Sequence, residues 1–360
     1  MGNLEVSRHF FSPFSLEIDK MEHLILINFE KDADKYYNVF ELQQAVCQDN
    51  TKRFLVIAYR KDGKADIYHQ PEYPFASQSS ILNDVSFFEV PMDDLQFRIN
   101  ADELFFKFSF TDKFGRQILV ELNEKNRSKK EPFFLLAPVG EVSKIPTVLP
   151  VYSLYEMSFT QRKHTRISIK IDNKSHKPDK FILPIDGARN YFSRYSLDTF
   201  NVDLNRNFDG RLIPVIPEYP DKANQNGVHY ELACNNDNYE ICRIKTQNSK
   251  HELSIDFTPP FPDVTHLADM TTLNGEFRIT TDHTKGNLRG NYMAKREANL
   301  VTTTLHPNNG WQPNETRLLL RLLYKMVNIF RNWPASYVWE AQINLDNPTE
   351  PYMQSSWKRV

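Results

Sequence analysis

Short strand-like runs surround a single long apolar helix in this 360-residue chain, and this contrast constrains the fold more than any other feature. About twenty runs of apolar or alternating residues have the length and the flanking turn residues of β-strands. The helix is expected from Glu315 to Arg331, with Asn314 as its N-cap and Pro334 preventing extension. The sequence therefore predicts an all-β, mainly antiparallel protein with one long C-terminal helix.

Two hairpins are predicted from turn chemistry and alternation. Asp62 and Gly63 lie between two strand-like runs, and glycine supplies the positive φ that a tight turn needs. In the run Leu104–Phe110, four large apolar side chains fall on one face, and a second run follows after Gly115. That face is expected to form core or the wall of a cavity.

A proline-rich segment from Glu131 to Pro150 is interpreted as a crossover between two halves. The predicted domains are an N-terminal β domain, residues 1–148, and a C-terminal β domain, residues 149–360, which includes the helix 315–331. The order of strands, flanking helix and one further strand resembles the architecture of calycins such as the lipocalins. This resemblance implies two barrels or β-sandwiches packed together. Lipocalin signature residues are absent from the N-terminal region, so no residue roles are carried over.

Composition and motifs exclude several classes of function. The 44 basic and 46 acidic residues are interspersed and give a net charge of -2, which argues against a nucleic-acid partner. Three cysteines without CxxC spacing indicate a reducing compartment, and no apolar stretch is long enough to span a bilayer, so a cytoplasmic location is expected. No nucleophile elbow, phosphate-binding glycine loop, dinucleotide fingerprint or HExxH motif is present. The sequence identifies no cofactor and predicts no metal site.

The densest catalytic candidate is the group Asp256, Asp263, His266 and Asp269, which is threaded through a proline-rich loop. Carboxylates and an imidazole can exchange protons near neutral pH or bind a divalent cation. The alternative interpretation is that Asp263 and Asp269 cap turns in a solvated loop and that His266 is an ordinary surface histidine.

A second candidate, Arg189, Tyr191, Arg194 and Tyr195, predicts a ligand site. Guanidinium groups can hold an anionic head group while the aromatic rings contact an apolar tail. Arg278, Arg289 and Tyr292 extend this hypothesis to a later hairpin. The alternative is that these arginines stack on tyrosines along exposed strands.

The C-terminal helix carries a basic arc, including Arg317, Arg321 and Lys325, on an otherwise apolar surface. Burial of the apolar part inside the molecule is expected, and docking on a membrane or partner is the alternative. The leading functional hypothesis is binding of a lipid-like or isoprenoid-like small molecule with a polar or anionic head group. The alternatives are a cofactor-free hydratase, isomerase or hydrolase acting on such a molecule, and an interaction protein that docks through the helix.

Overall fold

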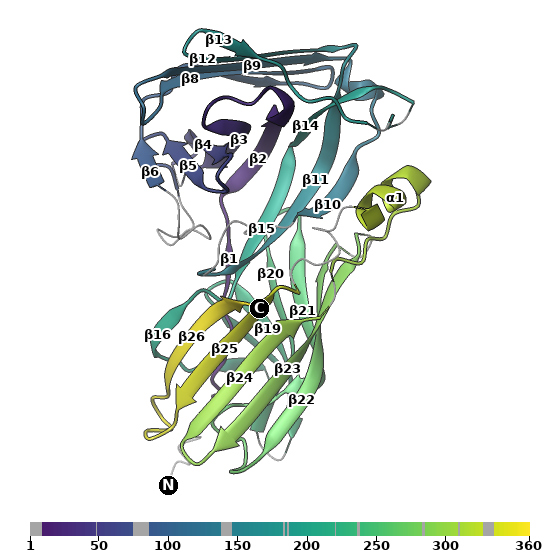
Figure 1. Ribbon diagram of the computed structural model, residues 1–360. Helices are drawn as coiled ribbons and strands as arrows, with labels where there is room; N and C mark the ends of the chain where they lie inside the picture. The colour runs from purple at the N-terminus through teal and green to yellow at the C-terminus, as the bar shows by residue number, and fades with distance from the viewer. Residues whose placement is uncertain are drawn as a thin grey trace.

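The computed structural model describes residues 9–360 except 48, 75–85, 138–145, 183, 186, 220, 236–237, 283–284, 309 and 327–334. The described residues form three antiparallel-rich sheets and one short helix, which confirms the predicted all-β class (Figure 1). The predicted hairpin at Asp62 and Gly63 is present, with Gly63 at φ 79°. Two short 3₁₀ turns, η1 (Glu30–Asp32) and η2 (Arg127–Lys129), complete the described elements.

A ten-stranded sheet forms the centre of the upper half of the molecule in Figure 1. Its strands lie in the order β1 (Leu16–Ile18), β15 (Asp198–Leu204), β11 (Leu149–Gln161), β14 (Asn190–Ser196), β2 (Met21–Asn28), β3 (Tyr37–Val46), β4 (Lys52–Arg60), β5 (Ala65–His69) and β6 (Ser86–Glu89), while β10 (Phe133–Ala137) also pairs with β11. Only the β5–β6 pair is parallel among these described strands.

A five-stranded sheet covers one face of the ten-stranded sheet (Figure 1). Its order is β13 (Lys174–His176), β12 (Thr165–Ile171), β9 (Gln117–Lys125), β8 (Glu103–Thr111) and β7 (Asp93–Ile99). The phenylalanine face predicted in β8 packs in the core between these two sheets, where Phe106, Phe108 and Phe110 are buried with Tyr195. The expected core role of this face is therefore confirmed.

An eleven-stranded sheet curls to form the lower half of the molecule (Figure 1). Its order is β16 (Phe208–Arg211), β26 (Tyr352–Arg359), β25 (Tyr337–Asn344), β24 (Leu300–Pro307), β23 (Asn287–Glu297), β22 (Thr272–Thr281), β21 (Glu252–Phe261), β20 (Asn238–Gln247), β19 (Val228–Asn235), β18 (Lys222–Gln225) and β17 (Pro217–Tyr219). Large aromatic side chains fill its inner face, and Phe14 from the N-terminal segment lies against Phe257 and Trp339 there. A filled interior explains how a strongly curled sheet is stabilised.

The division between sheets does not coincide with residue 148. Strand β11 begins at Leu149 and pairs with β14, which in turn pairs with β2 near the N-terminus. The chain passes to the eleven-stranded sheet only between Leu204 and Phe208. In neither large sheet do the described end strands pair with each other, so the calycin-like barrels of the prediction are not confirmed.

The C-terminal helix is shorter than predicted. Helix α1 spans Leu318–Met326, and the predicted end at Arg331 lies outside the described residues. Glu315 lies before the helix, and its carboxylate accepts hydrogen bonds from the backbone N–H and the guanidinium of Arg317, at 2.9 and 3.1 Å. Arg317 also donates to the carbonyl of Pro132 at 3.1 Å, which anchors the entry segment to the ten-stranded half.

Only one side of α1 is buried. Leu320 and Tyr324 are buried, and the hydroxyl of Tyr324 donates to the carbonyl of Phe134 in β10 at 2.8 Å. The expected burial of the whole apolar surface was wrong, since Leu318 and Met326 are largely exposed. Across the described chain, no helix has both the length and the apolar character needed to cross a bilayer.

Candidate functional site

The acidic loop that was predicted to be catalytic is held together by local hydrogen bonds. Asp263 is buried, and its carboxylate accepts bonds from the N–H and hydroxyl of Thr265 at 3.0 and 2.8 Å. The same carboxylate lies 3.0 Å from Nδ1 of His266. Asp269 instead caps the backbone N–H of Ala298 at 2.7 Å. The structure therefore brings Asp263 and His266 together, and leaves Asp269 in a separate turn-capping role.

Asp256 lies elsewhere, on the outer face of the eleven-stranded sheet. Its carboxylate pairs with Arg243 of the neighbouring strand, and Arg243 also reaches Glu231 at 3.2 Å. These partners neutralise one another on a solvated surface. Within the described residues, no three His, Cys, Asp or Glu side chains are arranged to hold a metal ion.

Strand alternation separates the residues predicted to bind a ligand near residue 190. Tyr195 is fully buried between the ten- and five-stranded sheets, whereas Arg194 points to the opposite face of β14. Arg189 is exposed, and its carbonyl accepts the N–H of Arg162 at 2.9 Å. Tyr191 is half-buried. Of these four residues, Arg194 has the setting that a head-group contact requires.

The later arginines lie on the outer face of the eleven-stranded sheet. Arg278 and Arg289 are direct cross-strand partners, and Arg278 lines an open hollow of about 830 Å³ together with Asp256. Tyr292 points to the inner face, where its hydroxyl donates to the carbonyl of Pro259 at 2.7 Å. Tyr292 therefore has a packing role and does not contribute to the same surface as the two arginines.

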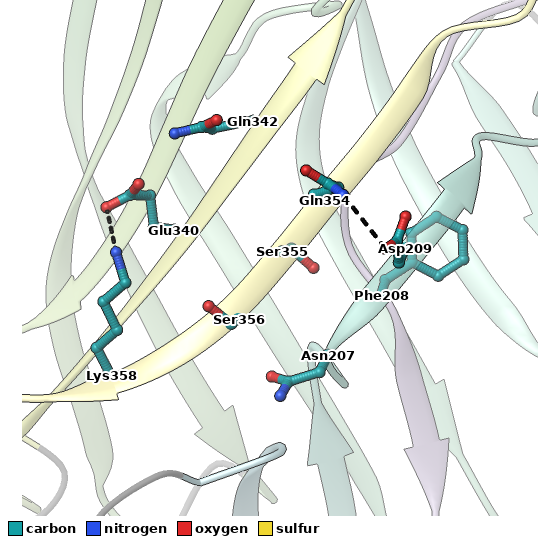
Figure 2. A pocket seen from close by; sticks show the side chains of 9 residues that line it. All are labelled: Asn207, Phe208, Asp209, Glu340, Gln342, Gln354, Ser355, Ser356 and Lys358. Carbon is teal, nitrogen blue, oxygen red and sulfur yellow. Dashed lines mark hydrogen bonds and ion pairs between the residues drawn. The ribbon is translucent and has the colours of Figure 1, made fainter.

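A smaller hollow of about 450 Å³ lies over β16, β25 and β26 (Figure 2). Four of its polar side chains form two pairs, since Lys358 pairs with Glu340 at 3.1 Å and Gln354 donates to Asp209 at 3.2 Å. Figure 2 shows these side chains spread across the strands with no convergence on one point. The charges of this surface are therefore paired, and it offers a ligand amide and hydroxyl groups only.

The face of the ten-stranded sheet opposite the five-stranded sheet carries a more distinctive group. We call it the Arg194 face; it comprises Asn28, Glu41, Gln43, Tyr59 and Arg194. Register places these residues together, since Arg194 is opposite Leu26, Leu26 is opposite Glu41, and Glu41 is opposite Ile57, two residues before Tyr59. Alternation then puts all five side chains on one face.

Arg194 is the cation of this face. Its guanidinium donates to the amide oxygen of Asn28 at 2.8 Å and lies over the ring of Phe192, 4.9 Å from the centroid. No other side chain in the described part of the protein hydrogen bonds to it. Burial lowers the pKa of Arg194, and the nearby charge of Glu41 acts in the opposite direction. An arginine has five N–H donors and stays protonated, so most of these donors are available for an anion.

Two acids, Glu41 and Glu30, lie near Arg194, and both are engaged by other groups. Glu30 accepts a hydrogen bond from the amide of Asn28 at 3.1 Å. The carboxyl of Glu41 accepts hydrogen bonds from the hydroxyl of Tyr59 and the amide of Gln43, each at 2.7 Å. Burial raises the pKa of Glu41 above its usual range, while these hydrogen bonds and the charge of Arg194 act in the opposite direction. A carboxyl whose ionised form is disfavoured is a weak counter-ion for a guanidinium.

A second polar group adjoins this face, formed by Asp19, Tyr152, Asn201 and Asp203. We call it the acidic arm. Strand β11 connects the two groups, because its Phe159 is opposite Arg194 and its Tyr152 is opposite Asn201. Burial and then the charges of Asp19, Asp203 and Glu41 raise the pKa of Tyr152. Burial, with the charge of Asp19, raises the pKa of Asp203 to about 7. Arg206 lies 3.5 Å from this carboxylate, and its charge acts on the pKa in the opposite direction.

Asn201 adds an independent signal of a missing partner. Its side chain is 1% exposed, and neither its amide nitrogen nor its amide oxygen has a hydrogen-bond partner in the described structure. Asn201 is directly opposite Tyr152 and two residues before Asp203, so it shares their face. Buried amides are normally paired with protein, water or ligand.

Most residues of this site could not be recognised from the sequence. Glu41 lies between Phe40 and Leu42 in a central strand, and Asn201 and Asp203 alternate with Phe200 and Val202. A polar residue in such a strand is as typical of a solvated outer face as of a buried functional site. The distinguishing signal was the combination of several such residues on strands that pair, and pairing between distant segments leaves no trace in local alternation.

Comparisons with known proteins give no family for this chain. No protein-family model matches it, and no curated protein or solved structure is detectably similar to it. The geometry of the Arg194 face and the acidic arm is therefore the basis for inferring a function.

Proposed function

We propose that the protein binds an apolar small molecule with an anionic or polar head group, and that the head group contacts Arg194. The observation that carries this proposal is the half-buried guanidinium with a single protein hydrogen bond, to Asn28, beside a carboxyl that is a weak counter-ion. Partly buried cations are normally paired, because leaving them unpaired is costly. An anionic ligand would supply the missing partner.

Aromatic rings beside Arg194 provide a surface for an apolar tail. Phe192 stacks on Phe181 with ring centroids 5.6 Å apart, and Phe181 stacks on Phe159 at 4.7 Å. Phe181 and Phe192 are only partly buried, so they have area left to cover. A row of rings leading away from a guanidinium suits a molecule that is polar at one end, such as a lipid-like or isoprenoid-like acid.

A titration with dodecanoate and dodecanol tests the proposal, because these probes differ only in the head group. The unaltered protein is expected to bind the acid about tenfold or more tightly than the alcohol, as a charge-assisted hydrogen bond provides. Arg194→Gln should remove this preference. Arg189→Gln is the matched control, since Arg189 is exposed only five residues away. Equal binding of both probes by the unaltered protein, or none, would contradict the proposal.

A second candidate function is a cofactor-free enzyme acting on the same ligand class by acid–base chemistry. The observation in its favour is the acidic arm, where burial raises the pKa of the Asp203 carboxyl to about 7 and the amide of Asn201 has no hydrogen-bond partner. In this proposal, Asp203 replaces Asp256 and Asp263 as the leading acid–base group. Asp203→Asn should retain ligand binding and abolish turnover; turnover retained by this variant would exclude the role of Asp203.

A further inference from the structure

Helix α1 presents an apolar face to solvent with cations along one edge. Leu318, Leu319, Leu322 and Met326 are 78%, 44%, 47% and 64% exposed. At about 100° per residue they fall within an arc of roughly 100°. Arg321 and Lys325 lie next to this arc, and neither has a carboxylate partner in the described structure. We call these six residues the α1 face.

The opposite side of the same helix is firmly attached to the molecule. Tyr324 is bonded to Phe134, and its ring lies 4.9 Å from the ring of Trp311. Arg317 anchors the preceding segment to the carbonyl of Pro132. The α1 face is therefore held outward on a fixed support. Figure 1 shows the helix projecting from the flank of the molecule beside β10.

We propose that the α1 face docks on an acidic lipid bilayer surface, with its leucines and methionine entering the interface and Arg321 and Lys325 contacting anionic head groups. The charge of the α1 face favours an acidic bilayer, because the described helix carries two cations and no acid, although the whole chain has a net charge of -2. Apolar insertion combined with attraction to anionic lipid is how short amphipathic helices bind membranes.

The size of the face also favours a bilayer over a protein partner. Stable protein interfaces bury roughly 800 Å² on each partner. Four aliphatic side chains, two of them less than half exposed, present much less than that. An interfacial helix, by contrast, can bind with a few inserted side chains, because binding strength grows with buried apolar area plus the electrostatic contribution.

Vesicle flotation of the full-length protein tests this proposal. Vesicles of phosphatidylcholine alone are compared with vesicles that also contain phosphatidylserine. We expect flotation with the mixed vesicles, and a loss of about tenfold or more in the bound fraction for Leu322→Ser with Met326→Ser. Arg321→Glu with Lys325→Glu should remove the preference for phosphatidylserine.

Matched controls separate these effects from general changes in apolarity or charge. Met270→Ser removes a methionine that is 76% exposed on a different loop, and Lys61→Glu with Lys170→Glu makes the same charge change on other exposed strands and turns. Both controls should float like the unaltered protein. Circular dichroism of each variant verifies that the β fold is retained.

Three results would overturn the proposal. The first is an absence of flotation with either vesicle. The second is equal binding to both vesicles that the two charge reversals do not change. The third is a concentration-dependent dimer that Leu322→Ser with Met326→Ser dissociates, without any vesicle binding, because the α1 face would then be covered by a second copy. The dodecanoate titration is independent of all three, so the two proposals can fail separately.

Discussion

The imidazole ring of His251 lies parallel to the phenol ring of Tyr155, with centroids 3.8 Å apart and planes 11° apart. The two nitrogens of His251 each lie 3.0 Å from a carboxylate, one from Asp198 and one from Asp282. Tyr155 and Asp198 belong to the ten-stranded sheet, whereas His251 and Asp282 lie at the ends of β21 and β22. These four residues join the two halves of the molecule.

Replacing His251 should weaken this junction. His251→Ala removes the stacked ring and leaves two carboxylates without their shared partner, so we expect a loss of about 2–4 kcal/mol in the free energy of unfolding. The exposed His306 provides the control, and His306→Ala should change stability by less than about 0.5 kcal/mol. Urea denaturation measures both. Equal midpoints for the two variants would show that the junction contributes little.

A buried ion pair connects the five- and ten-stranded sheets. Nζ of Lys130 pairs with the carboxylate of Glu124, donates to the carbonyl of Phe159 at 2.6 Å and lies 3.4 Å from the hydroxyl of Tyr195. Lys130→Met should cost about 3–5 kcal/mol, since it leaves the buried Glu124 carboxylate without a counter-ion. Gln161 and Thr165 still donate hydrogen bonds to this carboxylate, at 2.9 and 3.1 Å. Adding Glu124→Gln should recover much of this loss, because it removes the buried charge and keeps an oxygen that can accept the bonds from Gln161 and Thr165. A double-mutant cycle in urea checks the result, and additive losses would contradict it.

The raised pKa of Asp203 predicts a pH dependence of stability. Because the folded-state pKa is about 7 and the ordinary value is 3.8, the folded state binds the extra proton between these values. The stability that this carboxyl contributes is therefore present at low pH and is lost as the pH rises toward 7. Asp203→Asn mimics the uncharged form of the carboxyl. It should therefore change the free energy of unfolding little at about pH 4 and raise it by about 2–4 kcal/mol at about pH 8.

Thermal unfolding of Asp203→Asn and the unaltered protein across this pH range measures the difference. Asp209→Asn is the control, because Asp209 is on the surface of β16. A stability difference that does not change with pH would show that the Asp203 carboxyl is ionised throughout.

Gly290 marks a close approach of strands β23 and β24. A Cβ atom at Gly290 would lie 2.3 Å from the ring of Phe277 and 2.5 Å from the carbonyl oxygen of His306. The backbone oxygen cannot move aside without disturbing the strand pairing, so Gly290→Ala should cost about 2 kcal/mol or more. Gly275→Ala is a useful comparison, because the three atoms nearest to its Cβ all belong to the side chain of Tyr292. Calorimetry should rank Gly290→Ala as the more damaging change.

The fold class could be predicted from local sequence, because alternation and turn residues specify strands directly. The faces of β8, with Phe106, Phe108 and Phe110, and the turn at Gly63 illustrate this. The partners of each strand could not be predicted. The proline-rich segment before Pro150 resembles a linker in composition, yet it contains β10 and leads into β11, which is paired inside the ten-stranded sheet.

The candidate site could likewise be predicted only in part. Arg194 was identified from its neighbourhood of arginines and tyrosines, but its neighbours in sequence, Arg189 and Tyr195, point elsewhere. Its partners Asn28 and Glu41 come from β2 and β3, more than 150 residues away. The helix was predicted from its apolar pattern, but the contact of Arg317 with the carbonyl of Pro132, 185 residues away in sequence, could not be predicted.

Native mass spectrometry of the freshly purified protein, followed by denaturing extraction, tests the central claim most directly. The unaltered protein and Arg189→Gln should each carry a small apolar acid that is released on unfolding, while Arg194→Gln, purified in parallel, should carry none. If all three preparations are empty, also after incubation with a lipid extract, or if Arg194→Gln retains the same molecule, the Arg194 face is not the binding site.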